Sequence, residues 1–535
     1  MKKLLCVLLA LVMVLGLTSA MAEYWGGYTD TIDATIAVYQ RSSQGDAKDI
    51  WWWDFCREFF GINFEVTQLT ETGTYKSVAF ASGDMPDVFY QLFLDSSTLV
   101  EQGSVTGNLI ALDEYITPEL MPNLYRIYEA YPEYKATITA GDGHIYSLGG
   151  IGNGNAALMT FYINQRWLDE AGLDMPETLD EFTEVLAAFK EREELPENEG
   201  KTVVPLTGDL GNQPRFIANA FGWITDSAGY LTAVALDDVD GTPCFIYADE
   251  ERFPAFMEIM KEYIAAGYFS ADVYDDQYAG NQTAQQKAED LTGFDQNTSN
   301  AIDPNEWTAA KFLTSEWNDT PAVARTYNAI NCASFAISKS CDPDKVERLM
   351  QWVDWLYDVN NYYMSHWGPS QYETEYLYGL KSGYIATKND EDRWVLTCQE
   401  VLDGDYTSFG DYQNRRVQGI IDNQYLGLKA DLFGELTREV NPTKYTHKED
   451  ENVLPYLVDV YPSIRFFDAD TNTRIGELRT DINAYVNEQY VAFISGQKEL
   501  SEENLAEYFQ TLKDLGYEEY VQYFIDYYEA YLANK

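Results

Sequence analysis

The sequence predicts an α/β fold. Segments with strand and helix character alternate between residues 31 and 90, and a second α/β run extends from about residue 157 to residue 323. The chain has 535 residues, of which 46% are hydrophobic and 15% are aromatic. Since one domain takes roughly 100 to 200 residues, this length and composition indicate two to four domains or lobes, each with its own core.

The first run begins with an apolar strand at residues 31–39. A helix follows at 49–60 and ends before a glycine, and residues 62–69 alternate polar and apolar side chains as a half-buried strand does. Residues 75–81 have helical character, and a turn then leads into a short third strand that ends near Tyr90. This order of elements is typical of a parallel sheet with helices on its faces.

The second run opens with a strand that ends at residues 162–164. Residues 165–171 fit two helical turns, and Gly172 suits the left-handed position that ends a helix. Thr178 and Glu181 have the spacing of a capping box, which predicts that a longer helix begins there. The apolar residues that follow at helical spacing predict its buried face, namely Leu179, Phe182, Val185, Leu186 and Phe189.

The remainder of the chain is predicted from the same signals. Strand-like segments are found at 203–206 and 328–338, and helices at 254–266, around 284, at 344–357 and over most of 481–535. Ser501 is the expected N-cap of the last helical part. Residues from 368 to about 417 have the composition of loops.

The first 22 residues have the features of a cleavable signal peptide. Lys2 and Lys3 precede an apolar run at 4–17, which is too short to span a bilayer comfortably, and 20–22 form a small-x-small cleavage site. No cysteine follows the apolar run at the position of a lipoprotein signal. We therefore expect a mature protein outside the cytoplasmic membrane, secreted or at its extracellular face.

The net charge excludes one class of partner. The formal charge of −51 becomes −53 when Lys2 and Lys3 are removed with the signal peptide, which contains no acidic residue. Phosphate backbones and anionic lipid headgroups would repel such a protein. We therefore expect no nucleic-acid partner, and we interpret the charge as a means of solubility.

Five cysteines remain once Cys6 is removed, and their odd number excludes a dense disulfide framework. Cys332 and Cys341 are near enough in sequence to form a bridge, although buried free thiols are the favoured interpretation.

Patterns of catalytic and cofactor sites are missing from the sequence. The three histidines, at positions 144, 366 and 447, are far apart, and neither a G-x-S-x-G elbow nor a Walker loop occurs. Residues 152–157, GNGNAA, fit a loose form of the dinucleotide fingerprint but lead into a strand instead of a helix. Among 87 acidic residues, no glycosidase-type pair is distinguishable by inspection. We predict no catalytic residue, no cofactor and no metal ion, and a protein that is not an enzyme.

Aromatic residues are abundant, with 41 tyrosines and 12 tryptophans. Trp51, Trp52 and Trp53 stand in a row, and because successive helical residues are about 100° apart, they cannot all face one core. Trp52 belongs to the expected buried face, together with Phe55, Cys56, Phe59 and Phe60. Either Trp51 or Trp53 is then expected at the margin, where it either stacks on a ligand ring or packs at the rim of the core.

Taken in order, several segments resemble the large extracellular solute-binding proteins of bacterial ABC importers, especially the long carbohydrate-type members. Residues 81–88, ASGDMPDV, are similar to a family turn that leads into a strand, and 109–116 and 142–148 are similar to its LxxLDxxI and DGKIYGL segments. Residues 162–182 resemble a family strand and capped helix, 335–340 with 345–357 its return through the hinge, and 491–508, VAFISGQKELSEENLAEY, its ending. These segments are distributed over most of the mature chain.

The resemblance implies a periplasmic-binding-protein-like fold, with two α/β lobes joined by hinge strands and the ligand in the cleft. The implied first lobe comprises residues 23–148 and 322–368, and the second comprises 149–321 and 369–535 with a helical C-terminal part. The implied function is capture of a carbohydrate, expected to be an oligosaccharide, by lobe closure and its delivery to a membrane permease; we expect a monomer. The alternatives are a secreted carbohydrate-active enzyme and a binding or sensor protein without a transport role.

Position within this implied fold suggests ligand-binding residues. They are Arg41, Ser42, Trp51, Trp53, Asp87, Phe89, Tyr90, Asn153, Tyr162, Trp223 and Trp367. The sequence also departs from the family pattern in two places. Residues 195–201, LPENEGK, stand where many long members have a calcium loop but lack its spaced carboxylates, and the lipobox cysteine is missing.

Overall fold

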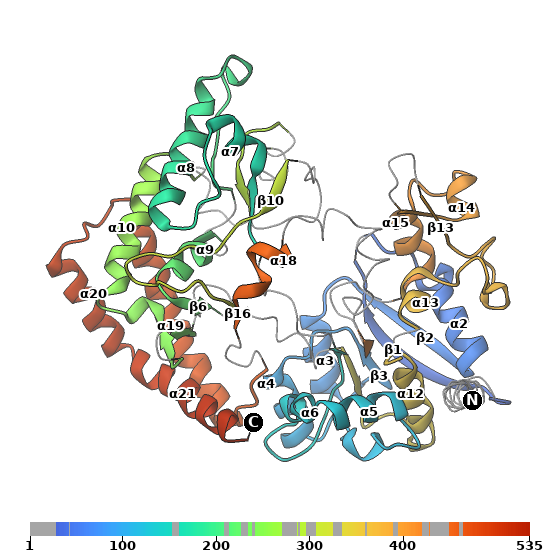
Figure 1. Ribbon diagram of the computed structural model, residues 1–535. Coiled ribbons are helices and arrows are strands. Elements are labelled where there is room, and N and C mark those ends of the chain that lie inside the picture. Colours follow the sequence, from blue (N-terminus) through green and yellow to red (C-terminus); the bar gives the residue numbers. More distant parts are fainter. Residues whose placement is uncertain are drawn as a thin grey trace, which may run out of the picture. The chain divides into compact units, whose positions relative to one another are not determined.

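A computed structural model of the chain (Figure 1) describes residues 28–41, 43–151, 160–207, 213–225, 234–237, 241–269, 286, 289–295, 306–324, 334–358, 361–388, 394–419, 427–428, 449–458 and 464–534. These residues form two compact units. The first unit takes the described residues within positions 1–153, 328–440 and 466–469, and the second takes those within 154–327, 441–465 and 470–535. The predicted signal peptide lies outside the described residues.

The first unit contains a four-stranded sheet in the order β12-β3-β1-β2. β1 (Ile32–Tyr39) pairs in parallel with β2 (Ile62–Leu69) from Ile32 opposite Ile62 to Tyr39 opposite Leu69, and it also pairs in parallel with β3 (Val88–Tyr90). β12 (Phe335–Ile337) is antiparallel to β3. The predicted parallel sheet with intervening helices is confirmed.

Helix α2 (Trp51–Phe60) lies between β1 and β2 in sequence, and Gly61 ends it in a left-handed conformation with φ 62°. The three consecutive tryptophans Trp51, Trp52 and Trp53 are all buried, with exposed fractions of 0%, 0% and 9%. The expectation that Trp51 or Trp53 lies at a margin is wrong, because distant segments cover the helix. The Nε1 of Trp51 donates to the carbonyl of Tyr376 over 2.7 Å, and Gly419 packs against the ring of Trp52.

The other elements of the first unit surround this sheet or follow it in sequence. They are η1 (Ala47–Asp49), α3 (Gly73–Ser82), α4 (Ser96–Leu99), η2 (Val100–Val105), η3 (Asp113–Tyr115), α5 (Pro122–Ala130), α6 (Pro132–Ile138), β4 (Gly150–Ile151), α12 (Pro343–Trp355), α13 (Tyr362–Trp367), η9 (Thr374–Tyr376), β13 (Ile385–Lys388), β14 (Trp394–Thr397), α14 (Gln399–Leu402), α15 (Phe409–Tyr412), η10 (Gln413–Val417) and β15 (Gly427–Leu428).

The segment from 369 to 419 differs from its prediction in two respects. It contains the hairpin β13–β14 and several short helices, where a loop-rich stretch was expected. It also belongs to the first unit, whereas the predicted division placed 369–535 in the second lobe. The physical reason is its contact with α2 through Tyr376 and Gly419, which no local sequence pattern encodes.

The second unit contains two three-stranded sheets, in the orders β10-β5-β9 and β6-β7-β8. The strands are β5 (Tyr162–Asn164), β6 (Trp223–Thr225), β7 (Val234–Asp237), β8 (Pro243–Phe245), β9 (Phe294–Asp295) and β10 (Trp307–Ala309), with a further pair β11 (Val323–Ala324) and β16 (Leu457–Val458). The helices are α7 (Gln165–Ala171), α8 (Leu179–Glu191), η4 (Arg192–Glu194), η5 (Pro196–Asn198), α9 (Gln213–Ala220), η7 (Ile246–Ala248), α10 (Arg252–Ala265), α18 (Glu449–Asn452), η12 (Leu454–Tyr456), α19 (Ala469–Ile494), α20 (Glu502–Asp514) and α21 (Tyr517–Asn534).

The helices α7 and α8 confirm the predictions made for their sequence. Gly172 ends α7 with φ 70°, and Thr178 and Glu181 form the reciprocal capping box of α8. The predicted face of α8 is the buried one. Ser501 also caps α20, where its hydroxyl accepts from the amide of Asn504.

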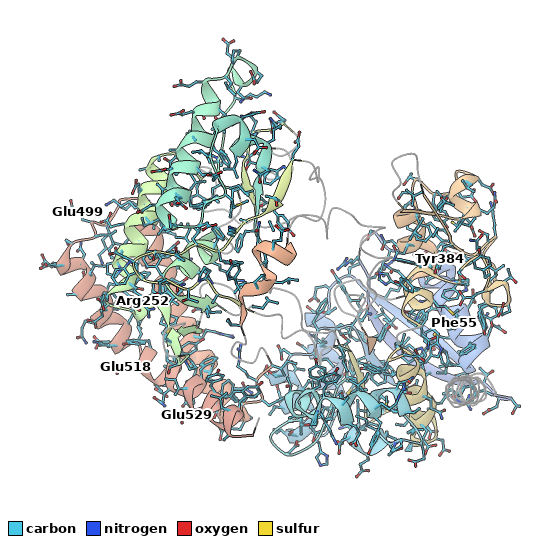
Figure 2. The ribbon with its side chains drawn as sticks, in the orientation of Figure 1. Phe55, Arg252, Tyr384, Glu499, Glu518 and Glu529 are labelled. Carbon is cyan, nitrogen blue, oxygen red and sulfur yellow. The ribbon has the colours of Figure 1, made fainter. Side chains whose placement is uncertain are left out.

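The C-terminal helices present acidic side chains to solvent. Glu499, Glu518 and Glu529 are exposed and point outward from this part of the second unit (Figure 2). None of the helices in the described ranges combines the length and apolar character needed to cross a bilayer. Cys341 is a buried free thiol whose pKa is raised to about 12 by burial, and Cys332 lies outside the described residues.

Candidate functional site

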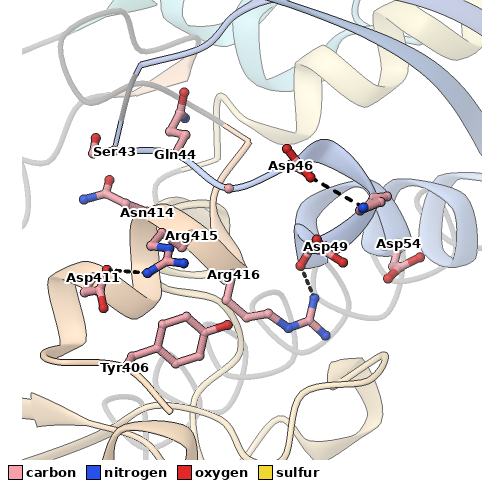
Figure 3. Close-up of a pocket in the computed structure, with 12 residues that line it drawn as sticks. Ser43, Gln44, Asp46, Asp49, Asp54, Tyr406, Asp411, Asn414, Arg415 and Arg416 are labelled. Atoms are coloured by element: carbon pink, nitrogen blue, oxygen red, sulfur yellow. Dashed lines mark hydrogen bonds and ion pairs between the residues drawn. The ribbon is translucent and has the colours of Figure 1, made fainter. Parts of the chain in front are cut away.

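A pocket of about 970 Å³ lies within the first unit (Figure 3). One wall comes from the loop after β1, from η1 and from the start of α2. The other comes from the segment that contains α15 and η10. The lining residues are Ser43, Gln44, Gly45, Asp46, Lys48, Asp49, Asp54, Tyr406, Asp411, Asn414, Arg415 and Arg416. The pocket is thus at the carboxyl end of a parallel strand, where open α/β sheets commonly bind ligands.

At Gly45 the backbones of the two walls approach each other closely. The amide of Gly45 donates to the carbonyl of Asn414 over 3.3 Å, and a Cβ at this position would lie 2.2 Å from the carbonyl oxygen of Arg415. Only glycine allows this approach. Gln68 on β2 fixes the same loop, because its side chain donates to the carbonyl of Gly45 (3.1 Å) and accepts from the amide of Ala47 (2.9 Å).

Arg416 links three segments around the pocket. Its guanidinium donates to the carbonyl of Asp49 (Figure 3). It also donates, over 3.0 Å, to the carbonyl of Gly379. The planar guanidinium can bond two acceptors at once, which a lysine ammonium does with less directional control. Arg416 therefore fixes the position of η10 relative to η1.

Two ion pairs lie at the surface of the pocket. Asp46 lies 3.5 Å from Lys48, and Asp411 lies 3.6 Å from Arg415. The backbone amide of Thr407, together with Arg415, lowers the pKa of Asp411, which favours its ionised form. These pairs are exposed and contribute little to stability. Their polar atoms are accessible to a ligand instead.

The chemistry of the pocket suits a ligand rich in hydroxyl groups. Carboxylates, amide side chains and guanidinium groups accept from and donate to hydroxyls, and Tyr406 adds an aromatic ring. No histidine or cysteine is among the lining residues. Within the described ranges, no group of three or more histidine, cysteine or acidic side chains is arranged to hold a metal ion.

Of the predicted ligand-binding residues, Arg41 lies beside the pocket. Its backbone amide donates to the side chain of Gln44 over 2.9 Å, and the amide of Gln44 donates back to its carbonyl. Ser42 and Asn153 lie outside the described residues.

The predicted residues on α2 and β3 do not line the pocket. Trp51 and Trp53 are buried in the aromatic core, and Phe89 and Tyr90 are fully buried in the sheet. Asp87 accepts from the amide of Thr35 over 2.8 Å and pairs with Lys345 at 3.3 Å, so its carboxylate joins β1 to α12.

The other three predicted residues are also largely buried. Trp367, in the first unit, contacts Tyr363 and Tyr384 and is 8% exposed (Figure 2 labels Tyr384). In the second unit, Tyr162 lies in β5 and is 3% exposed, and Trp223 is buried beneath the guanidinium of Arg252.

The sequence analysis did not predict the wall of the pocket at residues 406–416. The one local feature that could have indicated this wall is the pair of consecutive arginines, Arg415 and Arg416, in a strongly acidic chain.

Comparisons by sequence and by structure both find similarity to the same protein, FusA. No protein-family model matches the sequence. The fructooligosaccharide ABC transporter substrate-binding protein FusA of Streptococcus pneumoniae is 23% identical over 474 residues, which cover 86% of this chain and 83% of FusA. The structure of FusA in complex with kestose covers 94% of this chain and 100% of its own, with 20% identity and a TM-score of 0.69.

A second relative extends this result to another genus. An HMO-binding, ABC-transporter-associated solute-binding protein from Bifidobacterium longum infantis matches 94% of this chain and 99% of its own with a TM-score of 0.68 and 17% identity. The chain has the fold of the ABC-transporter solute-binding proteins. The resemblance inferred from the sequence and the two-lobed α/β fold class are confirmed. The solute-binding fold also accounts for two compact units in one chain.

Proposed function

We propose that the protein is the extracytoplasmic solute-binding component of an ABC importer, which captures an oligosaccharide and delivers it to a membrane permease. The observation that carries this proposal is the likeness to FusA, a fructooligosaccharide-binding protein, over most of both chains. The pocket in the first unit supports it, because its side chains suit sugar hydroxyls.

The ligand class follows from the charge of the pocket. Four carboxylates and three cationic side chains line it, so an acidic saccharide gains little from the pocket as a whole. The strongly negative chain also disfavours acidic ligands at longer range. We propose a neutral oligosaccharide.

In the proposed role, the protein binds its ligand and does not catalyse a reaction on it. Neither the sequence nor the pocket points to an acid–base pair, so we propose that the protein is not an enzyme. We further propose that the signal peptide is cleaved, that the mature protein acts as a monomer at the outer face of the cytoplasmic membrane, and that closure of the two lobes accompanies binding.

A thermal-shift screen of the mature protein tests this function. The probes are kestose, other neutral oligosaccharides and alginate oligosaccharides, with amino acids, peptides and a polyamine as comparison ligands. A ligand at 100 times its Kd stabilises the folded state by about 2.7 kcal/mol. We expect a shift with a neutral oligosaccharide, whereas a shift confined to peptides, amino acids or polyamines would contradict the proposal.

A further inference from the structure

The chain directly after β3 contains two residues with an unusual backbone. Gln91 and Phe93 have φ values of 55° and 56°, in the left-handed region that residues other than glycine, asparagine and aspartate seldom adopt. Conformations of this kind are strained and concentrate at functional sites.

The effect of this backbone is to separate neighbouring side chains. Leu92 and Leu94 are buried, with 1% exposed each, while Phe93 between them is 37% exposed. The segment is held in place at both ends. The amide of Gln91 donates to the carbonyl of Ser334 over 2.6 Å, and the ammonium group of Lys76 donates to the carbonyl of Phe93 over 2.8 Å.

The ring of Phe93 is supported from one side. Tyr39 meets it edge to face, with ring centroids 5.2 Å apart and an angle of 68° between the planes. Tyr39 is the last residue of β1, and Phe93 follows the end of β3, which is parallel to β1. The two rings therefore lie at the carboxyl edge of the sheet. The loop of the pocket leaves the same edge, and its first lining residue, Ser43, comes four residues after Tyr39.

We propose that Phe93, supported by Tyr39, is a stacking platform for one ring of a neutral oligosaccharide, in a subsite additional to the pocket. This inference rests on the proposed function. The C–H face of a sugar ring packs on an aromatic ring, while nearby polar groups bind its hydroxyls. Lys76 supplies an ammonium group beside the platform, so the subsite favours a neutral ring over an amine-bearing one.

The backbone conformation gives the proposal a distinctive test. A residue that serves only packing gains nothing from a left-handed conformation, whereas glycine adopts it without strain. Phe93→Gly is therefore expected to bind oligosaccharide more weakly and yet to unfold at the same or a higher temperature than the wild type. Phe93→Ala is expected to bind more weakly, and Phe93→Trp is expected to retain binding.

Calorimetric titration measures these effects with kestose, or with the saccharide that gives the largest shift in the screen. Aromatic contacts are worth about 0.5–1.5 kcal/mol, so we expect Phe93→Ala to raise Kd about two- to twelvefold, with a smaller effect on a monosaccharide. Tyr372→Ala is the matched control, since Tyr372 is 83% exposed in the same unit and is not at the sheet edge.

The outcomes separate the two proposals. If the wild type binds saccharide and Phe93→Ala binds it with unchanged Kd, the platform is refuted and the proposed function stands. An equal loss in Tyr372→Ala also refutes the platform. If the wild type binds no saccharide, the proposed function fails, and the platform fails with it.

Discussion

The guanidinium of Arg416 donates to the backbone carbonyl of Asp49, 367 positions earlier in the chain, and so joins the two walls of the pocket. A second bond from the same group reaches the carbonyl of Gly379. Since both acceptors are main-chain atoms, the contact depends on the shape of the arginine side chain and on the backbone of both walls.

Replacement of Arg416 should therefore destabilise the first unit and weaken ligand binding together. Hydrogen bonds from charged groups contribute about 1.5–3 kcal/mol, and at this partly exposed site we expect Arg416→Ala to lower the free energy of unfolding by about 1–3 kcal/mol. Chemical denaturation measures this change. Arg415→Ala removes a neighbouring side chain with an exposed fraction of 59%, and is expected to change stability little. Equal losses in both variants would contradict the role of Arg416.

Gly45→Ala should disrupt the pocket. The added Cβ would lie 2.2 Å from the carbonyl oxygen of Arg415, so one wall must move. We expect a lower melting temperature and a weaker affinity for the oligosaccharide found in the screen. Gly141→Ala is the control, because nothing lies within 4 Å of a Cβ there. A Gly45→Ala protein with wild-type affinity would show that the close approach is unnecessary for binding.

Asp354 makes stability depend on pH. This fully buried carboxylate accepts from the amides of Asn123 and Leu124 at the start of α5, and burial raises its pKa to about 7. The folded state then holds the proton more tightly than the unfolded state, whose pKa is near 3.8. The contribution to stability is complete below about pH 4 and declines as the pH rises to about 7, by at most about 1.4 kcal/mol per pH unit.

Asp354→Asn tests this dependence, because an amide does not titrate. Urea denaturation of both proteins between pH 4 and pH 8 gives the two slopes. We expect the difference in unfolding free energy, wild type minus variant, to fall as the pH rises. Parallel curves would rule out Asp354 as the titrating group.

Loss of the capping box should affect stability alone. The hydroxyl of Thr178 accepts from the amide of Glu181, and the carboxylate of Glu181 accepts from the amide of Thr178. Thr178→Ala is expected to lower the unfolding free energy by about 1 kcal/mol without changing ligand affinity. Thr480→Ala, on an exposed face of α19, removes a hydroxyl that donates to the carbonyl of Gly476 in the same helix, and should be neutral or slightly stabilising. If Thr480→Ala lowered the unfolding free energy as much as Thr178→Ala, the stabilising role of the capping box would be contradicted.

Local signals predicted much of the fold. The capping box at Thr178, the glycine at position 172 and the helical spacing around Phe182 are properties of a few adjacent residues, and each was confirmed. The alternation in 62–69 likewise predicted β2. Where a structure depends on neighbours in sequence, the pattern of side chains is sufficient.

The pocket depends on neighbours in space, and its second wall was not predicted. Nothing within 406–416 indicates that Arg416 reaches Asp49, because that contact is set by the packing of distant segments. The same reason explains the burial of Trp51: the helical wheel shows which residues share a face, but not that residues near Tyr376 cover the outer one.

Both walls of the pocket belong to one compact unit, and Gly45 and Arg416 connect them directly. Their spacing is therefore independent of any movement of one unit against the other. A saccharide can form its first contacts without waiting for a conformational change, so its association rate constant should resemble that for a preformed site. Closure would then lower the dissociation rate constant, so the residence time of the sugar would be determined by a step that follows its initial binding.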